Sequence, residues 1–147
     1  MAQGKNSRAI DEASLAERLR RVLAGFPAVR LAVLFGSTAR GHQTARSDID
    51  LGVLLDDDDP SQLWPIDAAA GEALRRTVDL VDLHRAPPLL RFEIARDGQP
   101  LLERHEGEWA RFKARAMIDW WDWAPMLRKF NRLAAQRLQE EWADGQG

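Results

Sequence analysis

The chain has 147 residues, which suits one compact domain and leaves little room for two. Its net charge of −2 provides no overall attraction to nucleic acid phosphates or anionic membranes, so binding of long nucleic acids is disfavoured. The lack of cysteine excludes disulfides, zinc–thiolate sites and cysteine nucleophiles, and no apolar run approaches the roughly 20 residues that span a bilayer.

The N-terminal part of the chain predicts a tail, a helix and a strand. Residues 1–8 are polar and are expected to form a flexible tail. Because they lack the apolar core of a signal peptide, a cytoplasmic location is the default expectation. Residues 9–24 carry leucines and a valine at helical spacing and predict an amphipathic helix that ends at Gly25. Residues 30–35 are a short apolar run before a glycine, which is typical of a buried strand.

A turn and a second strand follow. Residues 36–41 are expected to form a turn that leads into a short helix. Residues 48–55 predict a strand in which apolar side chains alternate with Asp48, Asp50 and Gly52. The alternation puts one face of this strand in the core and both aspartates on the other face.

The rest of the chain alternates helices and strands before a long helical end. After a loop at 56–60, the predicted elements are a helix at 61–76, a strand at 77–83, a helix from Pro87 to about Arg96, a strand at 99–102 and a helical stretch from Glu106 to about Trp142. Pro125 is expected to kink or divide this last stretch. The order predicts an α/β sandwich around a small mixed sheet of about four strands.

Gly36 and Ser37, followed after ten residues by Asp48 and Asp50, form the main candidate site. Two aspartates at i and i+2 on a strand leave the same face, and their carboxylates can converge on Mg²⁺ ions. A glycine lets a phosphate approach the backbone, and the free amides at a helix start attract it. Arg40 is a candidate partner of a phosphate oxygen. The alternatives are solvated aspartates on an open sheet face and glycines that serve the turn alone.

A third carboxylate is expected from the next strand, which offers Asp79 and Asp82. These residues are three apart, so they point to opposite faces and only one can join the site. Periodicity alone leaves the choice open. Ser47, directly before the aspartate pair, is a candidate for contact with a nucleotide or for capping the turn.

Two segments resemble the signature of the DNA polymerase β-like nucleotidyltransferase superfamily. Gly36–Gly41 (GSTARG) and Ser47–Leu51 (SDIDL) are similar to its glycine–serine and Asp-x-Asp motifs, most closely to those of the minimal nucleotidyltransferase (MNT) group. Val78-Asp79-Leu80 resembles the strand with the third carboxylate, so the resemblance favours Asp79. It covers about residues 15–104 and implies an α/β (α+β) nucleotidyltransferase fold.

The resemblance implies a metal-dependent enzyme that transfers AMP from ATP to a hydroxyl and releases pyrophosphate. It implies that Asp48 and Asp50 hold two Mg²⁺ ions, with Mn²⁺ as an alternative. Asp79 would bind the catalytic ion and help to activate the incoming hydroxyl. The expected nucleotide-binding residues are Gly36, Ser37, Arg40 and Ser47.

The resemblance also implies a partner. MNT proteins are often encoded beside HEPN ribonucleases and act as their antitoxins, and some attach AMP to a tyrosine of the toxin. The chain contains no tyrosine, so such a target would lie on another chain. Two alternatives are an antitoxin that acts by binding alone and a nucleotidyltransferase for a small molecule of the aminoglycoside type.

The C-terminal third of the chain is rich in tryptophan. We expect residues 9–104 to form the catalytic core and residues 105–147 to form a helical segment of the same domain. Trp120 and Trp121 are adjacent and diverge by about 100° on a helix, so the apolar surface is wider than one stripe. This surface is expected either to be core alone or to bind a partner or a second copy of the chain.

Overall fold

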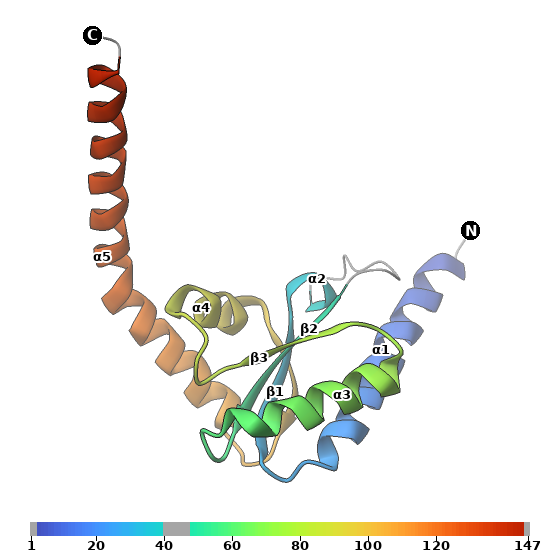
Figure 1. The fold of residues 1–147 in the computed structure, drawn as a ribbon. Coiled ribbons are helices and arrows are strands. Elements are labelled where there is room, and N and C mark those ends of the chain that lie inside the picture. Colours follow the sequence, from blue (N-terminus) through green and yellow to red (C-terminus); the bar gives the residue numbers. More distant parts are fainter. Residues whose placement is uncertain (1–2, 40–47, 146–147) are drawn as a thin grey trace.

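The computed structural model describes residues 3–39 and 48–145 of the chain. Its elements are α1 (Gln3–Ala24), β1 (Val29–Phe35), α2 (Gly36–Ala39), β2 (Ile49–Leu55), a 3-10 turn η1 (Pro60–Gln62), α3 (Leu63–Leu74), β3 (Val78–Asp82), α4 (Pro88–Asp97), β4 (Gln99–Glu103) and α5 (Glu108–Asp144). The expected order of helices and strands is confirmed. Figure 1 shows a sheet flanked by helices, with the end of α5 projecting away from the rest.

The four strands form one mixed sheet in the order β3-β2-β1-β4. β1 runs antiparallel to both of its neighbours, whereas β2 and β3 run parallel and are connected through α3. The predicted small mixed sheet is therefore confirmed, and its parallel pair contains the two strands that carry the candidate carboxylates.

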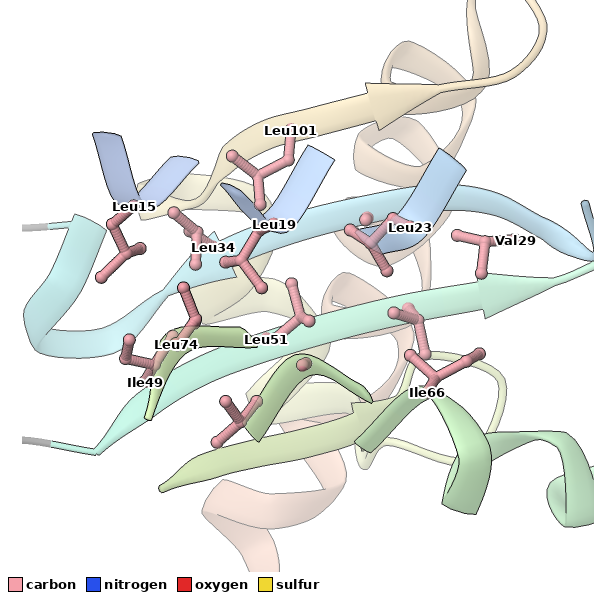
Figure 2. Packing of buried hydrophobic residues seen from close by; sticks show 14 of the residues in the cluster. Leu15, Leu19, Leu23, Val29, Leu34, Ile49, Leu51, Ile66, Leu74 and Leu101 are labelled. Carbon is pink, nitrogen blue, oxygen red and sulfur yellow. The ribbon is translucent and has the colours of Figure 1, made fainter. Parts of the chain in front are cut away.

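One face of the sheet packs against α1 and α3. The alternation in β2 sends Ile49, Leu51 and Val53 to this face, where all three are fully buried. Figure 2 shows Leu15, Leu19 and Leu23 of α1 on the same side of the sheet as Ile49 and Leu51, and all five belong to one buried cluster. This cluster is the larger of the two cores, and burial of each such side chain stabilises the fold by about 1.5–3 kcal/mol.

The opposite face packs against α4 and α5. Leu31 and Val33 of β1 lie in a second core with Ile94 of α4 and with Phe112 and Ala116 of α5. The apolar residues of β1 therefore serve both faces, as expected for a central strand covered on two sides.

The start of one helix differs from the prediction, and the predicted kink of the last helix is present. α1 begins at Gln3 rather than at residue 9, so most of the segment that we expected to be a tail is helical. α5 passes through Pro125 without division, but its axis changes direction along its length (Figure 1). A proline has no amide to donate to the carbonyl one turn earlier, which explains a bend. None of the described helices is long and apolar enough to cross a membrane.

Candidate functional site

The register of the parallel pair brings two carboxylates together. Asp50 of β2 lies directly opposite Asp79 of β3. Residues that pair across neighbouring strands project from the same face of the sheet. Both side chains therefore lie on the side of α4 and α5. Asp48 lies just before β2, two residues from Asp50, and shares that face. The structure thus gathers Asp48, Asp50 and Asp79 at the start of two adjacent strands.

Asp82 lies apart from this group. It is opposite Val53 in the register, so it faces the side of α1 and α3. Its carboxylate accepts a hydrogen bond of 2.6 Å from Arg85 and one of 2.9 Å from the backbone amide of His84. These partners fix the turn after β3. The register therefore brings Asp79, and not Asp82, to the other two aspartates.

Gly36 closes the site from the side of β1. Its φ is +68°, a left-handed conformation in which a side chain is strained. A Cβ atom at this position would also overlap the carboxylate of Asp50. Glycine is therefore required at this position for two reasons. It allows the turn from β1 into α2, and it allows the backbone to approach Asp50 closely.

The charges in the site repel one another. Burial raises the pKa of Asp50 above its usual value, and the negative charges of Asp79 and Asp48 raise that pKa further. Within residues 3–39 and 48–145, none of the three aspartates has a salt bridge. A cation bound beside Asp50 would relieve both the repulsion and the cost of burial.

The donor set fits a hard divalent cation that is shared with a substrate. Within residues 3–39 and 48–145, no three His, Asp or Glu side chains lie close enough together to hold a metal ion by themselves. Mg²⁺ commonly binds to one or two carboxylates and completes its shell with water and substrate phosphates. Carboxylates at the starts of β2 and β3, with Asp79 exposed to solvent, match that mode of binding.

The other predicted site residues are only partly placed. Ser37 lies within α2, directly after Gly36. Arg40 and Ser47 lie outside the described residues, so their predicted contacts with a nucleotide stay predictions.

Sequence reasoning missed one residue near the turn. The side-chain amide of Gln99, at the start of β4, donates a hydrogen bond of 3.4 Å to the backbone carbonyl of Ala39. It ties the end of α2 to the edge of the sheet. The two residues are separated by 60 positions, and no local pattern at Gln99 indicates the contact.

Comparisons with known proteins agree with this geometry. Residues 17–107 match the family model described as polymerase beta, nucleotidyltransferase. The chain is 32% identical over 117 residues to the protein adenylyltransferase MntA of Aphanizomenon flos-aquae, covering 72% of this chain and 78% of that protein. The match includes both motifs that carry the candidate aspartates, because these lie within residues 17–107.

Two solved structures show the same fold. A toxin–antitoxin crystal structure with AMP-PNP superimposes with a TM-score of 0.71 at 26% identity, covering 81% of this chain and 98% of that chain. An MNT antitoxin in complex with a tri-AMPylated HEPN toxin of Shewanella oneidensis gives a TM-score of 0.62 at 24% identity, covering 86% of this chain and 98% of that chain. The second likeness concerns the fold alone.

Proposed function

The chain belongs to the polymerase beta nucleotidyltransferase family, and from this premise we propose that it transfers AMP from ATP to a hydroxyl of a HEPN toxin and acts as the antitoxin. The register between Asp50 and Asp79, with Asp48 on the same face, is the observation that carries the proposal. The similarity to a protein adenylyltransferase and the fold shared with toxin–antitoxin complexes support the substrate and the partner.

The three aspartates have separate tasks in this proposal. Asp48 and Asp50 would hold two Mg²⁺ ions, and Asp79 would bind one of them and lie beside the incoming hydroxyl. Mg²⁺ bound to these residues would supply positive charge that offsets the phosphate charge in the transition state. Asp79 is exposed, so the hydroxyl of another protein can reach it.

The transfer needs one bond to form and one to break. The acceptor oxygen bonds to the α-phosphorus of ATP, the bond from that phosphorus to the pyrophosphate oxygen breaks, and the Asp79 carboxylate accepts the proton of the hydroxyl. No residue of the chain becomes covalently modified in this reaction. The rate enhancement would come mostly from the alignment of the hydroxyl with ATP and from neutralisation of the phosphate charge.

The turn after β1 holds the triphosphate. Because Gly36 has no side chain, the backbone beside Asp50 is accessible. Phosphate oxygens can therefore approach both the metal-binding carboxylates and the amides of the turn. Ser37 adds a hydroxyl donor, and Arg40 and Ser47 complete the set of donors to the nucleotide.

The test is to incubate the purified chain with isotope-labelled ATP, Mg²⁺ and a HEPN partner, and to weigh both proteins by mass spectrometry. We expect a gain of AMP on the partner that Asp50→Asn abolishes. Asp82→Asn is the matched control, because it removes the same charge from the same sheet on the side away from the site. A stable complex without any transfer would refute the enzyme and favour an antitoxin that acts by binding alone.

A further inference from the structure

β3 is one of the two outermost strands of the sheet, and it carries Asp79. The strand order β3-β2-β1-β4 leaves one edge of β3 without a neighbouring strand in the part of the chain that the structure describes. α3 packs over one face of β3 and does not extend the sheet. Figure 1 shows β3 at the outer side of the sheet, between α3 and α4. The edge next to the candidate site is therefore available for pairing with another chain.

The backbone groups on this edge lack partners. The amide of Ile49 donates a hydrogen bond of 3.0 Å to the carbonyl of Thr77, so alternate residues of the segment, from Thr77 onward, bond to β2. Val78 and Leu80 lie between them and direct their amides and carbonyls away from β2. Neither residue makes a backbone hydrogen bond to any described residue outside the sheet. β3 thus presents two unpaired amides and two unpaired carbonyls.

The other outermost strand, β4, is protected against such pairing. Pro100 has no amide, the backbone carbonyl of Leu101 accepts a hydrogen bond of 3.0 Å from the side chain of Arg20, and the pairing of β4 with β1 is irregular. Prolines, irregular pairing and covering contacts all protect a sheet edge against association. β3 contains no proline, and its pairing with β2 is regular. The two edges therefore differ, and the open one adjoins the site.

The register fixes what a strand added to this edge would face. Asp50 and Asp79 are opposite each other, so the residue that pairs with Asp79 on an added strand becomes the next member of the same row. In an antiparallel pair, the Cα atoms at a position without hydrogen bonds between the two residues are about 4.5 Å apart. The side chain of the added residue projects on the side of α4 and α5, as Asp79 does. A hydroxyl there lies beside the carboxylate that accepts its proton in the proposed reaction.

An extended segment of another protein is the occupant that fits this edge. The reaction proposed above needs a hydroxyl from outside the chain at Asp79, which is exposed. A helix bonds its own backbone groups, so it would leave the amides and carbonyls of Val78 and Leu80 unpaired. An extended segment pairs with them, which is a common mode of peptide recognition. Val81 lies on the same face as Asp79 and is partly exposed, so an added strand covers an apolar side chain as well.

We propose that the segment of the HEPN toxin that carries the acceptor hydroxyl adds to the free edge of β3 as an extra strand, with the hydroxyl residue opposite Asp79. The inference rests on the proposed transfer of AMP and adds how the acceptor is held. Because main-chain hydrogen bonds provide the affinity in this mode, the acceptor must be extended where it binds.

The first test is hydrogen–deuterium exchange of single amides, measured by NMR on the full chain with and without the toxin. An ATP analogue with a methylene group between the α- and β-phosphates keeps the complex from reacting. We expect the toxin to slow exchange at the Leu80 amide about tenfold or more. The amide of Val81, which faces β2, should be protected in both states and is the internal control.

The outcomes separate this inference from the proposed function. A toxin that gains AMP with ATP but leaves exchange at Leu80 unchanged overturns the strand addition alone. A toxin that protects Leu80 but never gains AMP overturns the transfer alone, and a toxin that does neither overturns both. Equal slowing in the concentrated chain without toxin shows that a second copy occupies the edge, which also overturns the proposal.

The second test removes one outward amide. Leu80→Pro leaves the bonds to β2 in place, because the amide of this residue points away from β2. Leu80→Ala is the matched control, since both variants lose the same partly buried side chain. We expect Leu80→Pro to raise the KM for the toxin about threefold to tenfold above that of Leu80→Ala, with the same Kd for ATP. Equal KM values in two variants that urea unfolding shows to be folded overturn the proposal.

The third test fixes the register by disulfide cross-linking. The chain has no cysteine, so an introduced thiol is its only one. In a toxin otherwise free of cysteine, Val81→Cys should link to a cysteine placed two positions from the acceptor residue, before it for an antiparallel strand or after it for a parallel one. Leu80→Cys is the control, because its side chain projects from the opposite face. Equal linking of the two variants, or none, overturns the register.

Discussion

Substitution of Gly36 tests the link between the backbone turn and the aspartates. Gly36→Ala places a Cβ on a residue with a φ of +68°, which costs about 1–2 kcal/mol of folding free energy. In a domain of this size such a loss lowers the unfolding temperature by roughly 2–8 °C. The same Cβ overlaps the carboxylate of Asp50, so the side chain must move from the position that it shares with Asp79.

Gly107 provides a control with the same backbone penalty. Its φ is +87°, and it lies before α5 at the other end of the sheet, where an added Cβ would contact only the flexible side chain of Arg111. Gly36→Ala and Gly107→Ala should therefore lose similar stability in denaturant unfolding. Only Gly36→Ala should lose AMP transfer, by about a hundredfold or more, as expected for displacement of a reacting group.

The comparison separates two explanations of an inactive variant. If both alanine variants lose activity in proportion to their stability, the defect is general unfolding. If Gly36→Ala keeps full activity, the closeness of Gly36 to Asp50 has no role in the reaction and the reasoning is wrong. Both measurements use the same folded preparations, with circular dichroism to confirm that the helices are intact.

Three other predictions concern charge. Asp50→Asn should raise the unfolding temperature of the metal-free protein at neutral pH, because it removes a partly buried charge that two neighbouring carboxylates repel; an unchanged or lower temperature would contradict this. Asp79→Asn should reduce AMP transfer about a hundredfold or more while Asp82→Asn leaves most of it, measured as the initial rate of pyrophosphate release; equal losses would contradict the separation of the two faces. Burial alone would raise the pKa of Glu108, but the hydrogen bonds and charge of Arg30 hold it below the usual 4.5. The ionised carboxylate therefore stabilises the folded state fully above that pH, and the contribution disappears as the pH falls through the folded pKa. Glu108→Gln should lower the free energy of unfolding by about 2 kcal/mol at neutral pH and by much less near pH 3, as measured by urea unfolding at both pH values. A loss of stability that does not change with pH would contradict the lowered pKa of Glu108.

The sequence was sufficient for the strands because their faces differ in chemistry. In β2 the alternation of apolar residues with Asp48 and Asp50 predicts both the strand and the side on which the carboxylates project. The choice between Asp79 and Asp82 needed information beyond the local sequence pattern. It depends on the register between β2 and β3, which joins residues 29 positions apart and leaves no trace in the local pattern.

Helix ends were harder to predict than helix existence. The polar residues before residue 9 lack a periodic apolar face, yet α1 begins at Gln3. Pro125 was expected to kink or divide the last helix, and α5 bends without being divided. At the start of α1 the competing conformations differ by small free energies, so that local sequence signals do not decide between them.

The aspartates of the site depend on the core beneath them. Three carboxylates that repel one another cannot hold a shared position by themselves, so other contacts must fix it. Ile49 and Leu51 alternate with Asp50 along β2, and Val78 stands opposite Ile49 on β3. All three lie in the buried cluster under α1 and α3. A slip of one residue between the strands would expose these apolar side chains and turn Asp79 away from Asp50, so the burial that stabilises the sheet also holds the carboxylates together.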